Sequence, residues 1–128
     1  MDYDFSNGPC AITYFEQFSG DVSYCLNNIE GFLDEIIRKK GEKPSGYIGD
    51  KITKFSELHP AEEKLVEDMR FLNDIRVILQ HGKLNRKTPD SDLECAHRKG
   101  KISITNELAK EFHNRYLKIY NKLIEIKR

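Results

Sequence analysis

The sequence predicts an all-α fold, a helical bundle of four main helices with a small β-hairpin between the last two. Apolar residues recur at spacings of three and four along most of the chain, which is the periodicity of amphipathic helices. Hydrophobic residues make up 38% and charged residues 33%, a balance typical of a folded protein with a solvated surface. The length of 128 residues fits one domain, 1–128, in which four helices can bury one another's apolar faces.

The first two helices are predicted from their apolar faces and from the residues that end them. Helix 12–37 has one apolar face, made of Ile12, Phe15, Phe18, Val22, Cys25, Leu26, Ile29, Phe32, Leu33, Ile36 and Ile37. The stretch RKKGEKPSG ends it with cations followed by Gly and Pro. YIGDKITKFSEL, residues 47–58, is a second, short helix with Ile48, Ile52 and Phe55 on one side, and His59 and Pro60 mark its boundary.

The third helix is expected over residues 60–81, with Gly82 as its C-terminal stop. Its stripe consists of Leu65, Met69, Leu72, Ile75 and Leu79. KLNRKTPDSD, residues 83–92, is typical of a loop, and LECAHRKGKISI, residues 93–104, of two short strands around a Lys-Gly turn. Thr105 is the expected N-cap of a final helix that reaches the C-terminus and turns His113 toward water. The buried side of this helix is formed by Leu108, Phe112, Ile119, Leu123 and Ile126.

Charge and cysteine usage exclude several classes of protein. Lys plus Arg and Asp plus Glu are both 21, which does not favour a constitutive duplex-DNA or membrane-surface binder. Cys10, Cys25 and Cys95 have no CxxC spacing, so neither a disulfide framework nor a thiolate zinc site is indicated. The sequence has no leader-like start, no apolar stretch near the roughly 20 residues that span a bilayer, and no GxSxG, Walker or GxGxxG motif. We expect a cytoplasmic protein.

Arg76 interrupts the apolar stripe of the third helix. On a helical wheel it falls roughly 20° from Leu65, inside the stripe. Because burial of an unpaired guanidinium is costly, Arg76 must extend to solvent, pair with a carboxylate, or line a cleft or interface that keeps it hydrated. A structural ion pair and a functional cleft both remain open.

His81 lies about 140° around the wheel from Arg76, in the last turn of the same helix. The carbonyl end of a helix favours a positive charge, which suits a general acid–base, although a cap or surface histidine is the alternative. Phe71 and Ile78 lie near His81 on this second side. They predict that this side meets either a second copy of the chain or another helix of the same chain.

The segment NDIRVILQHG resembles the RxxxxH signature of the HEPN superfamily. Arg76, His81 and Gly82 match it residue by residue, while YIGDKITKFSEL before it and GKISITNELAKEF after it resemble the layout of small bacterial HEPN proteins. The resemblance implies a metal-independent endoribonuclease of a defence or toxin–antitoxin system that acts as a homodimer. His81 would be the acid–base that helps a ribose 2′-hydroxyl attack the adjacent phosphate, and Arg76 would hold that phosphate.

Val77 departs from this family pattern, because active members commonly carry a polar residue directly after the arginine. The alternative is a non-catalytic HEPN-like domain that binds a partner protein or nucleic acid. A third reading is a plain helical interaction protein. No cofactor is implied, and RNA, a second copy, and an antitoxin or other protein are the expected partners, with no membrane.

A basic region follows the motif and could guide an RNA backbone toward His81. It contains Lys83, Arg86, Lys87, Arg98, Lys99 and Lys101. A solvated charge run is the alternative, because Asp90, Asp92 and Glu94 alternate with these cations. His97 near Cys95 makes a poor metal site, since no further ligands have suitable spacing.

Overall fold

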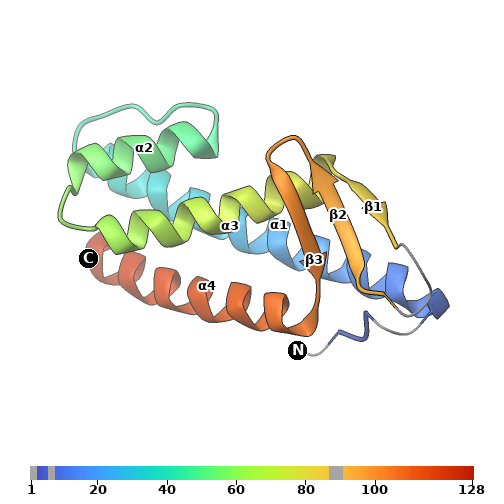
Figure 1. Ribbon diagram of the computed structural model, residues 1–128. Helices are drawn as coiled ribbons and strands as arrows, with labels where there is room; N and C mark the ends of the chain where they lie inside the picture. The colour runs from blue at the N-terminus through green and yellow to red at the C-terminus, as the bar shows by residue number, and fades with distance from the viewer. Residues whose placement is uncertain (1–2, 6–7, 87–90) are drawn as a thin grey trace.

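The computed structural model describes residues 3–5, 8–86 and 91–128 (Figure 1). Four helices account for most of the chain: α1 (Gly8–Lys39), α2 (Ile48–Leu58), α3 (Glu63–His81) and α4 (Asn106–Lys127). Three strands lie between α3 and α4: β1 (Lys83–Asn85), β2 (Leu93–His97) and β3 (Gly100–Ile104). The predicted largely helical fold with four main helices is therefore confirmed, while the predicted hairpin is part of a slightly larger sheet.

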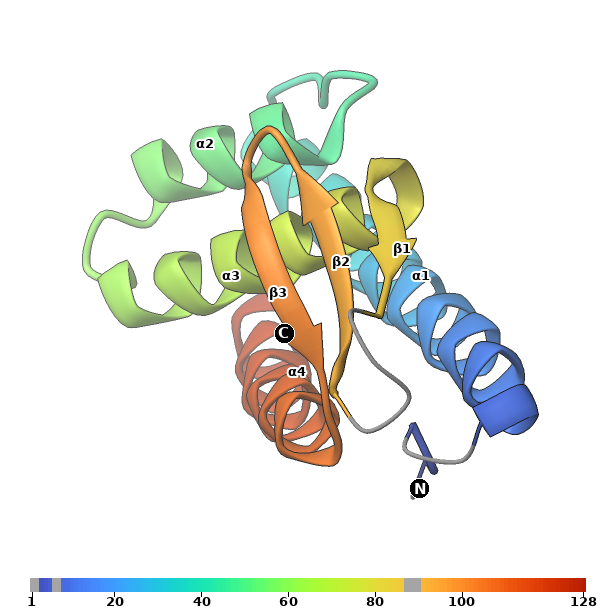
Figure 2. The same cartoon turned by 45° about the vertical axis from the view of Figure 1, so that its right-hand side comes forward.

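The helices pack as a bundle around α1 and α3, each of which contacts the other three helices. Figure 1 shows α1 and α4 running in the same direction and α3 running in the opposite direction. The sheet lies across the C-terminal half of α3, as Figure 2 shows, and β3 also contacts α4. The C-terminal end of α3 is therefore covered by strands rather than by another helix.

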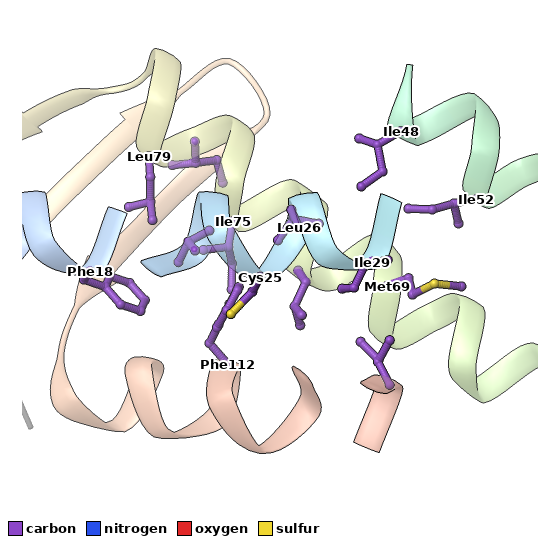
Figure 3. Packing of buried hydrophobic residues seen from close by; sticks show 14 of the residues in the cluster. Phe18, Cys25, Leu26, Ile29, Ile48, Ile52, Met69, Ile75, Leu79 and Phe112 are labelled. Atoms are coloured by element: carbon purple, nitrogen blue, oxygen red, sulfur yellow. The ribbon is translucent and has the colours of Figure 1, made fainter. Parts of the chain in front are cut away.

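The core is a continuous apolar cluster between the helices and the inner face of the sheet (Figure 3). Phe18 of α1, Met69 of α3 and Phe112 of α4 are completely buried in it. Burying a large apolar side chain contributes roughly 1.5–3 kcal/mol, so the predicted apolar stripes explain why these helices assemble. Cys25 and Cys95 are free thiols in this interior, where burial raises their pKa, to about 11 for Cys25. The side chain of Cys10 lies outside the described part.

The helix ends agree with the sequence at most junctions. The hydroxyl oxygen of Thr105 accepts a hydrogen bond from the N–H of Leu108 at 3.1 Å, which confirms the predicted N-cap. His59 follows the last residue of α2 and stacks on Phe55, with ring centroids 5.0 Å apart. Helix α3 begins at Glu63 rather than at Pro60, because Pro60 lies in the turn that joins α2 to α3.

The loop predicted for residues 83–92 is wrong at its start, where Lys83–Asn85 forms β1. The three strands are antiparallel in the order β1-β2-β3, with Leu84 opposite Cys95 and Cys95 opposite Ile102. Three residues are too few for alternation to indicate a strand, so β1 is defined by its pairing with β2. Part of the predicted loop, residues 87–90, lies outside the described residues.

Gly82 ends α3 as predicted, but for a different reason. Its φ of −83° is open to any residue, so no left-handed conformation requires glycine here. A Cβ at this position would overlap the carbonyl oxygen of Ile78 in α3, and it would lie 2.7 Å from the sulfur of Cys95 and 2.8 Å from the carbonyl oxygen of Ala96. Glycine is therefore needed because both the last turn of α3 and strand β2 lie against this position.

His113 corrects another expectation, since it does not face water. Its ring is half-buried and lies against the aromatic rings of Tyr3, Phe18 and Phe112. The hydroxyl of Tyr3 donates a hydrogen bond to Asp21 and lies 3.3 Å from Nε2 of His113. Burial lowers the pKa of His113 below its usual 6.5. The burial of His113 could not be predicted from the sequence, because it depends on contact between the N-terminal segment and α4.

Replacing Gly82 by alanine should destabilise the fold by about 1–3 kcal/mol, because the added methyl group overlaps β2. Gly31→Ala is the matched control. It lies in α1 with no atom within 4 Å of a new Cβ, so it should stabilise the protein by about 0.5–1 kcal/mol. Urea unfolding of both variants measures the difference. Equal effects would contradict the close approach of β2.

The His113 contact also predicts a pH dependence of stability. The unfolded state takes up the proton near pH 6.5, whereas the folded state takes it up only at lower pH, so the folded state loses stability as the pH falls below 6.5. His113→Gln removes this titration. Its unfolding free energy should fall less between pH 7.5 and pH 5.5 than that of the unchanged protein. If the unfolding free energies of both proteins changed in parallel with pH, the His113 ring would have the same pKa in the folded and unfolded states, which would contradict this prediction.

Candidate functional site at the end of α3

Arg76 lies half-buried in the C-terminal half of α3, held by two neutral amides. Its Nε and Nη2 donate to the side-chain oxygen of Asn73 at 3.2 and 3.0 Å, and its Nη1 donates to that of Gln80 at 3.4 Å. Throughout the described ranges, Arg76 forms no ion pair. The alternative of a structural ion pair is therefore not met there, and the guanidinium keeps an uncompensated charge.

The local sequence explains how this cation is held. Asn73 and Gln80 stand three residues before and four residues after Arg76, the spacings at which side chains meet on a helix. Gln80 in turn donates to the hydroxyl of Ser23 at 3.1 Å, which links the set to α1. Neither amide is identified from the sequence as a site residue, although their spacing from Arg76 could have indicated them.

His81 lies exposed in the last turn of α3, where the sequence placed it. Its nearest ring is that of His97 at the end of β2, with centroids 6.3 Å apart and planes tilted by 44°. The sequence indicates His97 only as a poor metal ligand, so its approach to His81 is seen only in the fold. The two histidines therefore form a pair at the end of α3.

Arg76 and His81 are not in contact, as their separation of about 140° on the wheel predicts. Their partners belong to separate sets, the amides of α3 for Arg76 and the ring of His97 for His81. Between them on the wheel lies Val77, which is half-buried and apolar. Within one chain, the two motif residues therefore flank an arc of the helix that is at least partly open to solvent.

The second side of α3 does not present a free apolar face. The guanidinium of Arg115 lies over the ring of Phe71, 3.9 Å from its centroid, and Ile78 is buried where the sheet covers the helix. Both residues thus pack within their own chain. Of the two alternatives for this side, packing within the same chain is met for Phe71, which lies against Arg115 of α4, while Ile78 packs under the sheet rather than against a helix.

Some cations of the basic region are bound to other groups of the protein and some are exposed. Lys99 and Lys101 pair with Asp74 and Glu94 at 3.7 and 3.3 Å, and Arg86 donates to the backbone carbonyl of Phe5. Lys83 and Arg98 are exposed and form no ion pair among the described residues, while Lys87 lies outside them. Two exposed cations therefore remain available near the end of α3.

A metal centre is not indicated in the part of the chain that is described, since no group of three or more His, Cys, Asp or Glu side chains is placed to hold an ion. Over the same residues, no helix is both long and apolar enough to cross a membrane. Comparisons of the chain with protein-family models, with curated proteins and with solved structures found no match. The function must therefore be inferred from the residues of the site.

The surroundings of Arg76 predict that it contributes little to stability. Arg76→Met should change the free energy of unfolding by less than about 1 kcal/mol, because neutral hydrogen bonds have small net values and solvent can replace them. Thermal or urea unfolding measures this change.

Arg115→Met is the matched control for that substitution. Arg115 lies 3.2 Å from the carboxylate of Asp68, which is only 4% exposed, so its loss should cost about 1–3 kcal/mol. A large loss of stability in Arg76→Met would mean that Arg76 is structural and not held ready for a ligand.

Proposed function

We propose that the protein is a metal-independent endoribonuclease with Arg76 and His81 as its active pair. The observation that supports this most is the Arg76 guanidinium, which forms no ion pair among the described residues and is held by two amides on the helix that carries the exposed His81. A planar cation with several donors suits a phosphodiester, and an imidazole can exchange protons near neutral pH. The resemblance of NDIRVILQHG to the HEPN motif points to the same chemistry.

In the proposed reaction, the nucleophile comes from the RNA. His81 removes the proton of a ribose 2′-hydroxyl, and that oxygen attacks the adjacent phosphorus. Arg76 donates to the phosphoryl oxygens, whose negative charge grows as the bond to the 5′ oxygen breaks. The products are a 2′,3′-cyclic phosphate and a free 5′-hydroxyl. The exposed Lys83 and Arg98 can attract the backbone of the strand on either side.

The proposed enzyme acts as a homodimer in a bacterial defence or toxin–antitoxin system in the cytoplasm, with an antitoxin or another protein as its regulator. The dimer would unite residues that one chain keeps apart, because Arg76 of one copy can then face His81 of the other across a shared cleft. The homodimer follows from the HEPN resemblance. Its structural support is that Arg76 and His81 have different neighbours within one chain, the amides for Arg76 and the ring of His97 for His81.

Val77 favours a second candidate, a domain of the same kind that binds RNA or a protein without cutting it. A half-buried valine beside Arg76 adds no hydrogen bond that could orient the phosphate. In this case the cation and the basic residues would still give salt-sensitive binding.

Incubation of the purified protein with single-stranded RNA in excess chelator separates these candidates. The unchanged protein should leave cyclic phosphate ends, and His81→Ala should lower the rate by about 10²–10⁴-fold because it removes the acid–base. Arg76→Ala should lower it at least as far.

Arg38→Ala is the control, since Arg38 is an exposed arginine in the last turn of α1, at the far end of the bundle. It should keep full activity. Cleavage that persists in His81→Ala would contradict the proposed enzyme, and salt-sensitive RNA binding without cleavage would support the second candidate.

A further inference from the structure

His97 stands beside His81 because of the way the end of α3 meets β2. Gly82 has no side chain, so β2 can lie against the last turn of the helix, and the thiol of Cys95 donates to the carbonyl of Ile78 at 3.2 Å. His97 is two residues after Cys95 and therefore projects from the same, inner face of the strand. This register brings its ring to 6.3 Å from that of His81.

The turn after β2 fixes which nitrogen of His97 carries a proton. The backbone N–H of Lys99 donates to Nδ1 at 3.2 Å, so Nδ1 is the acceptor and the neutral ring carries its proton on Nε2. Nε2 is the nitrogen farther from the backbone. His97 thus offers one hydrogen-bond donor at a defined position, close to an imidazole that is open to solvent.

The charges around the two rings do not oppose an anion. Asp74 is on the same side of α3 as His81, but the ammonium group of Lys99 lies 3.7 Å from its carboxylate. Lys83 and Lys101 flank Ala96 on the opposite, outer face of the sheet, so they lie away from the rings. A phosphoryl group near the rings would therefore meet the two imidazoles, beside a carboxylate that Lys99 already pairs.

We propose that His97 is a second residue of the phosphate site, whose Nε2–H donates to a phosphoryl oxygen while His81 handles the proton of the nucleophile. This inference rests on the proposed function for its catalytic part, whereas the binding of a phosphodiester by the two rings does not require cleavage. It names a residue outside the Arg76 and His81 motif and takes it from a different element of the fold.

Each atom has a defined place in this step. The 2′ oxygen forms a new bond to phosphorus, the bond from phosphorus to the 5′ oxygen breaks, and the 2′ proton passes to His81. The departing 5′ oxygen takes a proton from water, and His81 returns its own to the solvent. His97 keeps its proton and stabilises the charge that grows on the phosphoryl oxygen, as a fixed neutral donor can.

The test compares three forms of the full chain: unchanged, His97→Ala and His97→Gln. Glutamine places an amide donor near the position of Nε2, so it should retain the hydrogen bond. The first probe is single-stranded RNA in chelator, and the second is a dinucleotide with a 2′-deoxy sugar, which binds without being cut. Ring signals of His81 and His97 are followed by NMR during titration with the dinucleotide, and thermal unfolding checks that each variant is folded.

We expect His97→Ala to lower kcat by about 10²-fold and to weaken binding of the dinucleotide about tenfold. His97→Gln should stay within about tenfold of the unchanged protein in kcat, because it keeps a donor to the phosphoryl oxygen. Both rings should shift together in the titration of the unchanged protein.

Unchanged cleavage in a folded His97→Ala, with no movement of the His97 signals, would overturn the inference and leave the proposed function standing. Joint shifts of both rings in a protein that cuts no RNA would overturn the proposed function and support the two-histidine phosphate site.

Discussion

The close approach between the end of α3 and strand β2 is the constraint on which the arrangement of this protein depends. At Gly82 there is no room for a side chain, since a Cβ would overlap the sulfur of Cys95 and the carbonyl of Ala96. The strand therefore lies against the helix end, with Cys95 buried and hydrogen-bonded to Ile78. This contact buries Ile78 beneath the sheet and brings His81 beside His97.

The buried and half-buried cations of the bundle fall into two groups: some pair with carboxylates, and Arg76 binds only neutral amides. Lys51 of α2 is only 7% exposed, and its ammonium lies 2.8 and 2.9 Å from the carboxylates of Glu30 and Asp34 on α1. Burial alone would lower the pKa of Lys51, but the hydrogen bonds to both carboxylates prevail and raise it. Arg115 is likewise paired with Asp68. These cations hold helices together.

Arg76 is arranged differently from those structural cations. Its neighbours orient the guanidinium without neutralising it, because Asn73 and Gln80 offer amide oxygens rather than carboxylates. An anion that approaches this part of α3 therefore gains an interaction that the fold has not already used. The same chain thus separates cations that stabilise the fold from a cation that remains available to a ligand.

Much of the fold could be predicted from the sequence, because long amphipathic segments decide where helices form and which side they bury. Ile48, Ile52 and Phe55 are all buried on α2, as their spacing indicates. Strand β1 could not be predicted, since three residues have no periodicity of their own and depend on pairing with β2.

The candidate site was predictable only in part. The wheel places Arg76 inside the apolar stripe and His81 in the last turn. His81 lies there, and Arg76 is half-buried with its guanidinium bound to Asn73 and Gln80. The positions of His97 and His113 depend on contacts between segments distant in the sequence, which local patterns do not encode. Polar partners on other elements, unlike Asn73 and Gln80 beside Arg76, appear only when the elements are assembled.

An experimental structure of the protein bound to a short single-stranded oligonucleotide with 2′-deoxy sugars would show whether Arg76 and His81 hold a phosphate. We expect one phosphate within hydrogen-bond distance of the Arg76 guanidinium and close to an imidazole of His81 from either copy, with Asn73 and Gln80 still bound to the arginine. An oligonucleotide bound elsewhere, with Arg76 turned to a carboxylate, would contradict it.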